Sequence, residues 1–232
     1  MIEVIAFDAD DTLWHNEPHY LEAKTRFGQL LSGHAGEQAE RRLDDVEVQN
    51  VHVYGYGIRS FTLSMIEAAV NYTECRVTGR EIEGILGLGR HMLTAGVELF
   101  DHAQETLARL SAVFELMLIT KGDHFEQDRK VECSGLAPYF RHVEIVGEKT
   151  AASYREVLER CGVDAKRFLM VGNSLKSDVL PVLEIGGSAV YIPYTHTWAH
   201  ERVADAAIPE TGYFELEHLG QLPALVDKLM LE

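Results

Sequence analysis

Basic residues are scarce in this sequence. Its 232 residues include 21 lysines and arginines against 37 aspartates and glutamates, which gives a formal net charge of −16 at pH 7. Such a charge repels the phosphate backbone of nucleic acids and the surface of anionic membranes, so we expect neither as a partner. A small phosphorylated substrate is still compatible, because a metal ion and one or two lysines can reverse the field locally.

Cysteines, prolines and long apolar runs are also few. Cys75, Cys133 and Cys161 lie far apart without a CxxC pair, which predicts buried, reduced thiols rather than a zinc site or a disulfide framework. His196 and His200 have no third ligand in view and predict a surface segment.

No apolar run reaches the ~20 residues that cross a bilayer, and the first residues lack the basic segment of a signal peptide. With 46% hydrophobic residues and six prolines, we expect a folded, cytoplasmic protein.

An alternation of strand and helix patterns runs through most of the chain. The apolar, β-prone residues 2–7 are typical of a buried parallel strand. Further strands are predicted at 114–120, 142–146, 168–172 and 188–192, with helices between them and a closing amphipathic helix over 219–231. This alternation predicts a parallel α/β sheet.

One long segment interrupts the alternation after the first strand. In it, apolar residues recur at helical spacing and no strand pattern is visible. Thr78 and Glu81 have the spacing of a capping box, which predicts the start of a helix. We therefore expect an α/β core domain made of residues 1–15 and 98–232, and a helical domain made of residues 16–97.

Polar clusters follow four of the predicted strands. They are Asp8, Asp10 and Thr12 after the first strand, Thr120 and Lys121 after the second, Lys149 after the third, and Gly172–Asp178 after the fourth. In an open parallel sheet, ligands bind beyond the carboxyl ends of the strands. One such cluster is an ordinary loop, but four in the same position predict a shared site.

The residue types in these clusters suit phosphoryl transfer. A carboxylate can attack phosphorus as a nucleophile and form an aspartyl-phosphate. Two anions approach each other in that reaction, so a hard cation such as Mg²⁺, which prefers carboxylate, phosphate and water oxygens, has to offset their charge. A threonine hydroxyl can donate to a phosphoryl oxygen, and a lysine supplies positive charge to the transferring group.

In order and spacing, the four clusters resemble motifs I to IV of the haloacid dehalogenase superfamily, beginning with Asp8-Ala9-Asp10-Asp11-Thr12. The helical insertion between the first two motifs is similar to the C1-type cap of phosphatase-like members, and the resemblance covers essentially the whole chain. It implies a Rossmann-like parallel sheet with helices on both faces, together with an inserted all-helical cap that closes over the leaving group.

The resemblance also implies catalytic roles. Asp8 would be the nucleophile and a metal ligand. Asp10 would protonate the leaving group, then activate water, and would bind Mg²⁺ through its main-chain carbonyl. An aspartate at this second position favours phosphoryl transfer, because the dehalogenases of the family lack it. Thr120 and Lys149 would complete the catalytic set, whereas Thr12 would brace the loop.

The fourth cluster departs from the commonest phosphatase pattern of the family. There, the residue after the glycine is an aspartate that binds Mg²⁺, whereas this chain has Asn173, a neutral and weaker ligand. Asp178, five residues later, would bind the metal directly or through water. Lys149 is the favoured motif III lysine because a helix and the fourth strand follow it, and Lys121 and Lys176 are competing choices.

Five residues are candidates for contact with the substrate. They are His15, Tyr54, Tyr56, Arg59 and Lys121. The two tyrosines and the arginine lie among glycines before a predicted helix, which is typical of a substrate-facing turn. An equally open alternative is that the tyrosines pack between helices while the arginine is solvated.

The sequence therefore predicts a Mg²⁺-dependent phosphatase for a small phosphorylated metabolite, acting as a monomer or a homodimer. A phosphomutase of the same family is an alternative. Asn173 leaves open a member that binds a phosphorylated ligand without turnover. A signalling receiver domain is disfavoured, because its acidic pair and its acceptor lie on different strands, whereas Asp8 and Asp10 are two residues apart.

Overall fold

A computed structural model describes residues 1–34, 36–195 and 212–231 of the chain, so His196 and His200 lie outside the described residues. The chain divides into two compact units. The core unit comprises Met1–His15, Val97–Lys121 and Gln127–Glu232, and the helical unit comprises Asn16–Gly96 and Gly122–Glu126. None of the helices in the described ranges is long and apolar enough to cross a membrane.

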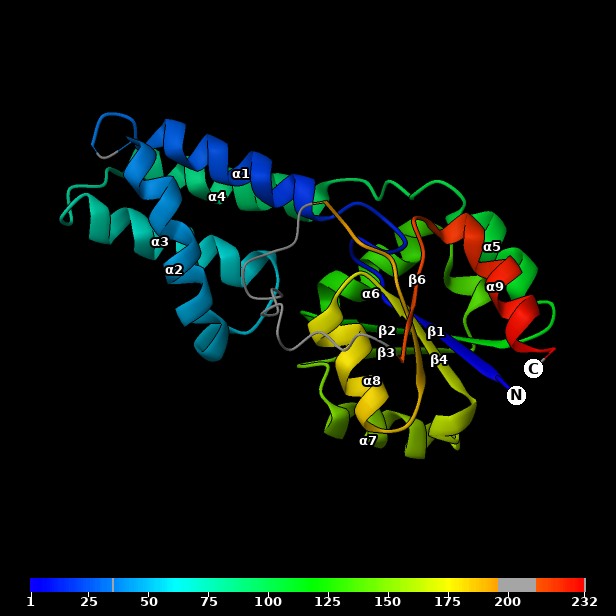
Figure 1. Cartoon of the computed structure of the whole chain (residues 1–232). Coiled ribbons are helices and arrows are strands. Elements are labelled where there is room, and N and C mark those ends of the chain that lie inside the picture. Colours follow the sequence, from blue (N-terminus) through cyan, green and yellow to red (C-terminus); the bar gives the residue numbers. More distant parts are fainter. Residues whose placement is uncertain (35, 196–211, 232) are drawn as a thin grey trace. The chain divides into compact units, whose positions relative to one another are not determined.

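The core unit is built on a parallel sheet of six strands in the order β3-β2-β1-β4-β5-β6 (Figure 1). The strands are β1 (Val4–Phe7), β2 (Glu115–Lys121), β3 (His142–Val146), β4 (Phe168–Gly172), β5 (Ser188–Tyr191) and β6 (Phe214–Glu215). The direction in which strands are added reverses between β1 and β4. In a sheet of this kind the reversal opens a crevice at the carboxyl ends of the two central strands.

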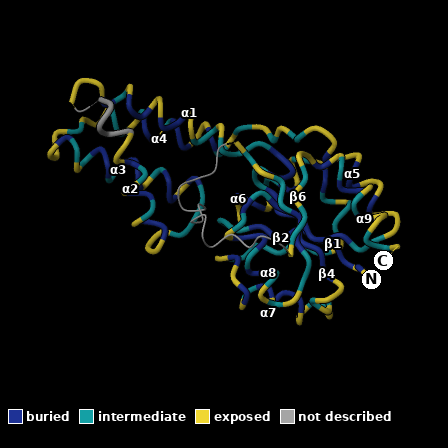
Figure 2. Tube along the Cα trace, viewed as in Figure 1, coloured by how far each residue is buried: buried dark blue, intermediate teal, exposed yellow. Residues whose placement is uncertain are grey.

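Helices cover both faces of the sheet (Figure 1). One face carries α5 (Ala103–Leu110), α6 (His124–Ser134) and α9 (Leu222–Leu229), and the other carries α7 (Ala151–Cys161) and α8 (Leu180–Glu184). Short 3-10 turns occur at Ala137–Tyr139, Ala165–Arg167 and Leu219–Gln221. Ile5 and Phe7 of β1 belong to the first apolar core, whereas Val4 and Ala6 belong to the second. Both faces of the central strands are therefore buried, as Figure 2 shows in dark blue, which explains their continuous apolar runs.

The helical unit contains α1 (Glu17–Leu30), α2 (Gly36–Tyr54), α3 (Ile58–Tyr72) and α4 (Gly79–Thr94). Phe27, Phe61 and Met65 are buried in its own apolar core. The predicted capping box is confirmed: Thr78 Oγ1 accepts a hydrogen bond from the Glu81 amide, and the Glu81 carboxylate accepts one from the Thr78 amide at 2.7 Å. Its separate apolar core makes this unit a second folded body rather than a loop.

The predicted fold class, a Rossmann-like parallel sheet with an inserted helical domain, is confirmed. The sequence did not predict β6, because two residues are too few to show strand periodicity. The expectation of buried cysteines is wrong. Cys75 on a turn and Cys133 on α6 are exposed, and Cys161 packs against the second apolar core but stays partly exposed.

Candidate active site at the carboxyl edge of the sheet

The four predicted clusters belong to the core unit, where β1 and β4 lie side by side at the crevice. The amide of Asp8 donates to the carbonyl of Val171 at 2.9 Å, which continues the pairing of the two strands by one residue. Asp8 is thereby held at the end of a buried strand, directly beside the loop that begins at Gly172. The loops after these central strands supply the acidic residues of the site.

A tight turn follows β1. The amides of Thr12 and Leu13 both donate to the carbonyl of Ala9, at 3.2 and 2.8 Å. Asp11 adopts a left-handed backbone conformation with φ of 60°, which aspartate tolerates better than most residues. Its amide donates to the carbonyl of Trp14 at 2.8 Å. Asp11 is therefore the residue that closes the turn, which the sequence did not indicate.

Lys149 bridges two carboxylates at the centre of the site. Its ammonium group lies 2.5 Å from Asp8 Oδ1 and 2.7 Å from Asp178 Oδ1, and all three residues are buried. Thr12 donates its hydroxyl to Asp8 Oδ2 at 2.9 Å, so both oxygens of Asp8 have donors. Lys149 directly precedes Thr150, which caps α7, and this helix start fixes the position of the lysine. In the sequence, Lys149 was the favoured motif III lysine only because a helix and a strand follow it. In the structure, Lys149 contacts Asp8.

The charges of this cluster are not balanced. Burial opposes a charge on Lys149, but the carboxylates of Asp178 and Asp8 outweigh it and raise the pKa of the lysine. For Asp178, burial and the charge of Asp8 raise the pKa from 3.8 to about 7, against the opposing effect of Lys149. One ammonium group is shared by two carboxylates, so an excess of negative charge is confined in a buried site.

The loop after β4 depends on a glycine. A Cβ atom at Gly172 would lie 2.2 Å from Asp178 Oδ2, so no other residue fits without displacing that carboxylate. Asp178 lies in a π-helical turn, Leu175–Val179, and its Oδ2 accepts a hydrogen bond from the amide of Ser174 at 3.0 Å. Asn173 Oδ1 is 3.3 Å from the Thr12 hydroxyl. Asp8 and Asp178 both contact Lys149, and Asn173 and Asp8 both contact Thr12.

Asp10 is held by three donors. Trp14 Nε1 donates to its Oδ1 at 2.7 Å, Gln127 Nε2 donates to its Oδ2 at 2.8 Å, and Lys130 Nζ lies 2.9 Å from both oxygens. Burial would raise the pKa of Asp10, but the charge of Lys130 and the three hydrogen bonds hold it below its ordinary value. Asp10 is therefore an ionised carboxylate in a fixed position.

Sequence reasoning missed the partners of Asp10. Gln127 and Lys130 are three residues apart on α6 and so share one face of the helix that follows β2. This three-residue spacing, directly after the strand that carries the second motif, is the sequence feature that indicates a shared helix face. Gln127 Oε1 also accepts the hydroxyl of Thr120 at 3.4 Å, so a chain of hydrogen bonds links Thr120 to Asp10. Through these hydrogen bonds, α6 connects Thr120 of the second motif to Asp10 of the first motif.

The candidate substrate residues lie in different surroundings. In the core unit, Lys121 donates to Ser177 Oγ at 3.2 Å, and the ring of His15 lies 3.9 Å from that of Phe100 between centroids. In the helical unit, Tyr54 ends α2 and is exposed, and Tyr56 is partly exposed. Contact of these residues with a substrate stays a prediction.

Arg59, the fifth candidate, belongs to a polar cluster of the helical unit. Its guanidinium lies 2.5 Å from Asp123 Oδ1 and 3.7 Å from Glu126 Oε1. Glu126 is buried and accepts hydrogen bonds from the amides of Ile58 and Arg59, at 2.8 and 3.2 Å, so it caps the start of α3. These contacts give Arg59 a structural environment, and its contact with a substrate stays a prediction.

The oxygen atoms around Asp8 fit a hard divalent cation. Asp8 and Asp178 provide carboxylates, and Asn173 provides an amide oxygen close to Thr12. Mg²⁺ prefers such oxygen ligands and keeps several waters. Burial, followed by the charge of Asp8, raises the pKa of Asp178, and a cation would stabilise its ionised form. No thiol or imidazole takes part in this cluster among the described residues.

Comparison with known families agrees with this arrangement. A family model described as a hydrolase of the haloacid dehalogenase-like type matches residues 2–186. The chain belongs to this family. It is therefore a hydrolase whose curated relatives include phosphatases. The family membership that the motifs predicted is confirmed.

Three relatives illustrate the range of the similarity. N-acylneuraminate-9-phosphatase of Mus musculus is 26% identical, over 98% of this chain and 95% of the relative. A haloacid dehalogenase-like hydrolase of Xanthomonas campestris is 40% identical with a TM-score of 0.88, covering 98% of this chain and 91% of that one. The HAD-hydrolase YfnB of Bacillus subtilis, solved with bound magnesium, is 16% identical with a TM-score of 0.68, covering 97% of this chain and 99% of that one.

Proposed function

We propose that this chain is a Mg²⁺-dependent phosphatase that hydrolyses a small phosphomonoester through an aspartyl-phosphate on Asp8. The observation that carries the proposal is the cluster of Asp8, Lys149 and Asp178 at the crevice between β1 and β4. The Asp10 carboxylate lies on the same turn as Asp8, directly after β1. The phosphatase relative and the magnesium-bound neighbour support it.

In the first half of the reaction, a carboxylate oxygen of Asp8 attacks phosphorus and the bond to the ester oxygen breaks. Asp10 takes up a proton from solvent when the phosphate ester binds, and the leaving alkoxide then takes this proton. The negative charge of a bound phosphate raises the pKa of a nearby carboxyl group, which suits Asp10 to this acid role. Thr120 donates its hydroxyl to a phosphoryl oxygen, and Lys149 offsets negative charge on Asp8 and the phosphoryl group.

In the second half, water attacks the phosphorus of the aspartyl-phosphate and the bond to Asp8 breaks, which releases inorganic phosphate. Asp10 accepts the proton of that water. Its lowered pKa, which Lys130 maintains, keeps the carboxylate ionised and ready for this base role. Mg²⁺ would be held by Asp8, the main-chain carbonyl of Asp10, Asp178 and Asn173, and would supply charge neutralisation for the approaching anions.

The mechanism is tested by phosphate release from an aryl phosphate with wild type, Asp8→Asn and Asp10→Asn, in Mg²⁺ and in EDTA. Asp8→Asn removes the nucleophile and is expected to reduce release to background, and EDTA does the same for the wild type. Activity that survives Asp8→Asn contradicts the mechanism. Asp128→Asn, an exposed position on α6, is the matched control.

A panel of metabolite phosphates identifies the substrate class, beginning with acylated sugar-acid phosphates because of the phosphatase relative. The two alternative functions give different results in the same panel. A mutase isomerises a sugar phosphate without net phosphate release. A binding protein that lacks turnover shows an increase in Tm with a phosphorylated ligand and releases no phosphate.

A further inference from the structure

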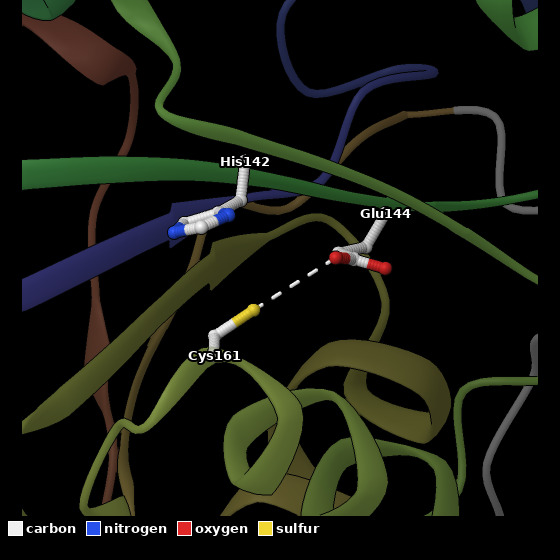
Figure 3. Close-up of side chains that lie close together, drawn as sticks. All are labelled: His142, Glu144 and Cys161. Carbon is white, nitrogen blue, oxygen red and sulfur yellow. Dashed lines mark hydrogen bonds between the residues drawn. The ribbon is translucent and has the colours of Figure 1, made fainter.

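A second group of ligand-type side chains lies in the core unit. His142 and Glu144 of β3 and Cys161 at the end of α7 each place one potential metal-binding atom within 4.8 Å of the others. Figure 3 shows the three side chains directed toward a common space between the strand and the helix. All three residues are partly exposed, so an ion can reach them from solvent.

The fold explains why these residues meet. His142 and Glu144 are two positions apart in β3 and point to one face, where their register partners on β2 are Met117 and Ile119. Those partners belong to the apolar core that α7 covers, and Cys161 packs against the same core.

This group is separate from the Asp8 site. His142 is the first residue of β3 and Cys161 is the last residue of α7. Lys149 lies at the opposite ends of both elements, after β3 and before α7. The His142 group therefore lies toward the amino edge of the sheet, and the Asp8 site lies at the carboxyl edge.

The distance between the thiol and the carboxylate is close to that between two ligands of one zinc ion. Cys161 Sγ is 3.8 Å from Glu144 Oε1. With Zn–S and Zn–O bonds of about 2.3 and 2.1 Å, two ligands of a tetrahedral zinc ion are about 3.6 Å apart. Glu144 pairs with Arg160 through its other oxygen, Oε2, so its Oε1 stays directed toward the thiol. The sulfur and the carboxylate are already placed almost as the ion requires.

The histidine has a supporting partner. Its Nε2 lies 3.2 Å from Glu115 Oε1 on the neighbouring strand β2, which leaves Nδ1 for an ion. Metal-binding histidines commonly hold a carboxylate with their second ring nitrogen, which fixes the orientation of the ring. Glu115 is therefore a second, independent feature that points to a metal ligand.

We propose that Cys161, Glu144 and His142 form a binding site for Zn²⁺, with Glu115 holding the histidine ring and water completing the tetrahedron. A thiolate with an imidazole selects zinc-type ions over Mg²⁺, which prefers oxygen ligands throughout. One thiolate and one carboxylate neutralise the two charges of the ion. The ion would link the edge strand β3 to α7 and stabilise the core unit. The sequence showed no zinc pattern because the ligands come from two separate elements.

The test uses Co²⁺ as a spectroscopic probe of the reduced full-length chain. A thiolate ligand produces a charge-transfer band in the near ultraviolet that oxygen ligands do not produce, so ions bound at Asp8 and Asp178 do not contribute. We expect the band in wild type and in Cys133→Ser, which removes another free cysteine, and its loss in Cys161→Ser. Zn²⁺ added in equal amount to the bound Co²⁺ is expected to abolish the band.

Two further variants keep the thiol and test the other ligands. Glu115→Gln is expected to weaken Zn²⁺ binding by about 10- to 100-fold, as changes to the partners of metal-binding histidines do. His142→Gln removes a direct ligand and is expected to weaken it at least as much. Circular dichroism of the metal-free variants checks that each variant is folded. If Cys161→Ser does not fold, His142→Gln takes its place as the variant that removes a direct ligand. Absence of the band in wild type, or its persistence in Cys161→Ser, overturns the proposal.

Discussion

Raising the pH of the metal-free protein is expected to destabilise the folded core through Asp178. The pKa of this carboxyl is about 7 in the folded protein against an ordinary value of 3.8. Between these values the folded state holds a proton that the unfolded state has lost, so the free energy of unfolding falls as pH rises. Since one pKa unit corresponds to ~1.4 kcal/mol, the contribution is about 4 kcal/mol, complete above pH 8.

The measurement is chemical denaturation in EDTA at a series of pH values from 4 to 9, followed by tryptophan fluorescence. The difference in unfolding free energy between wild type and Asp178→Asn isolates this group, because the amide cannot ionise. We expect the difference to grow with pH in favour of the variant. Mg²⁺ at pH 8 is expected to recover stability in wild type and far less in Asp178→Asn, since binding to the folded state stabilises it.

Asp128→Asn serves as the control, because Asp128 is exposed and outside the cluster. It is expected to retain the wild-type dependence on pH. If Asp178→Asn shows the same dependence on pH as wild type, then the excess charge around Lys149 does not reside on Asp178. The argument for a cation at this position would then fail.

Three other changes test separate contacts. Gly172→Ala places a Cβ atom against the carboxylate of Asp178 and is expected to raise the Mg²⁺ concentration needed for half-maximal activity more than tenfold, measured by metal titration. Lys130→Met releases Asp10 and is expected to lower kcat about tenfold or more with little change in KM, whereas Lys130→Arg restores part of the loss, measured by steady-state kinetics. Glu126→Ala removes the cap of α3 and is expected to cost about 1–2 kcal/mol in unfolding free energy, measured by denaturation.

Local patterns predicted most of the sheet. The strands at 142–146 and 168–172 have the predicted bounds, and Val4–Phe7 lies inside the predicted run. These strands are buried on both faces, so their apolar content carries the signal without help from the rest of the fold. The two residues of β6 carry no such signal, and their place in the sheet follows from pairing with β5.

The environment of each site residue was less predictable. Two aspartates two residues apart look alike in the sequence, yet Asp8 contacts Lys149 and Asp10 contacts Lys130. The second lysine lies 120 residues from its partner in the chain. Only the packing of α6 against the sheet brings the pair together, and no local pattern encodes that distance.

By itself the sequence determined the alternation of strands and helices, the helical insertion and the loops that carry the acidic residues, because periodicity and turn chemistry are local properties. The tertiary structure decided which charged side chains pair with one another. Lys149 lies between Asp8 and Asp178, and Gly172 leaves room for the second carboxylate. Cys161 packs against an apolar core and also lies beside Glu144. These pairings depend on strand order and helix packing, which act between residues far apart in the chain.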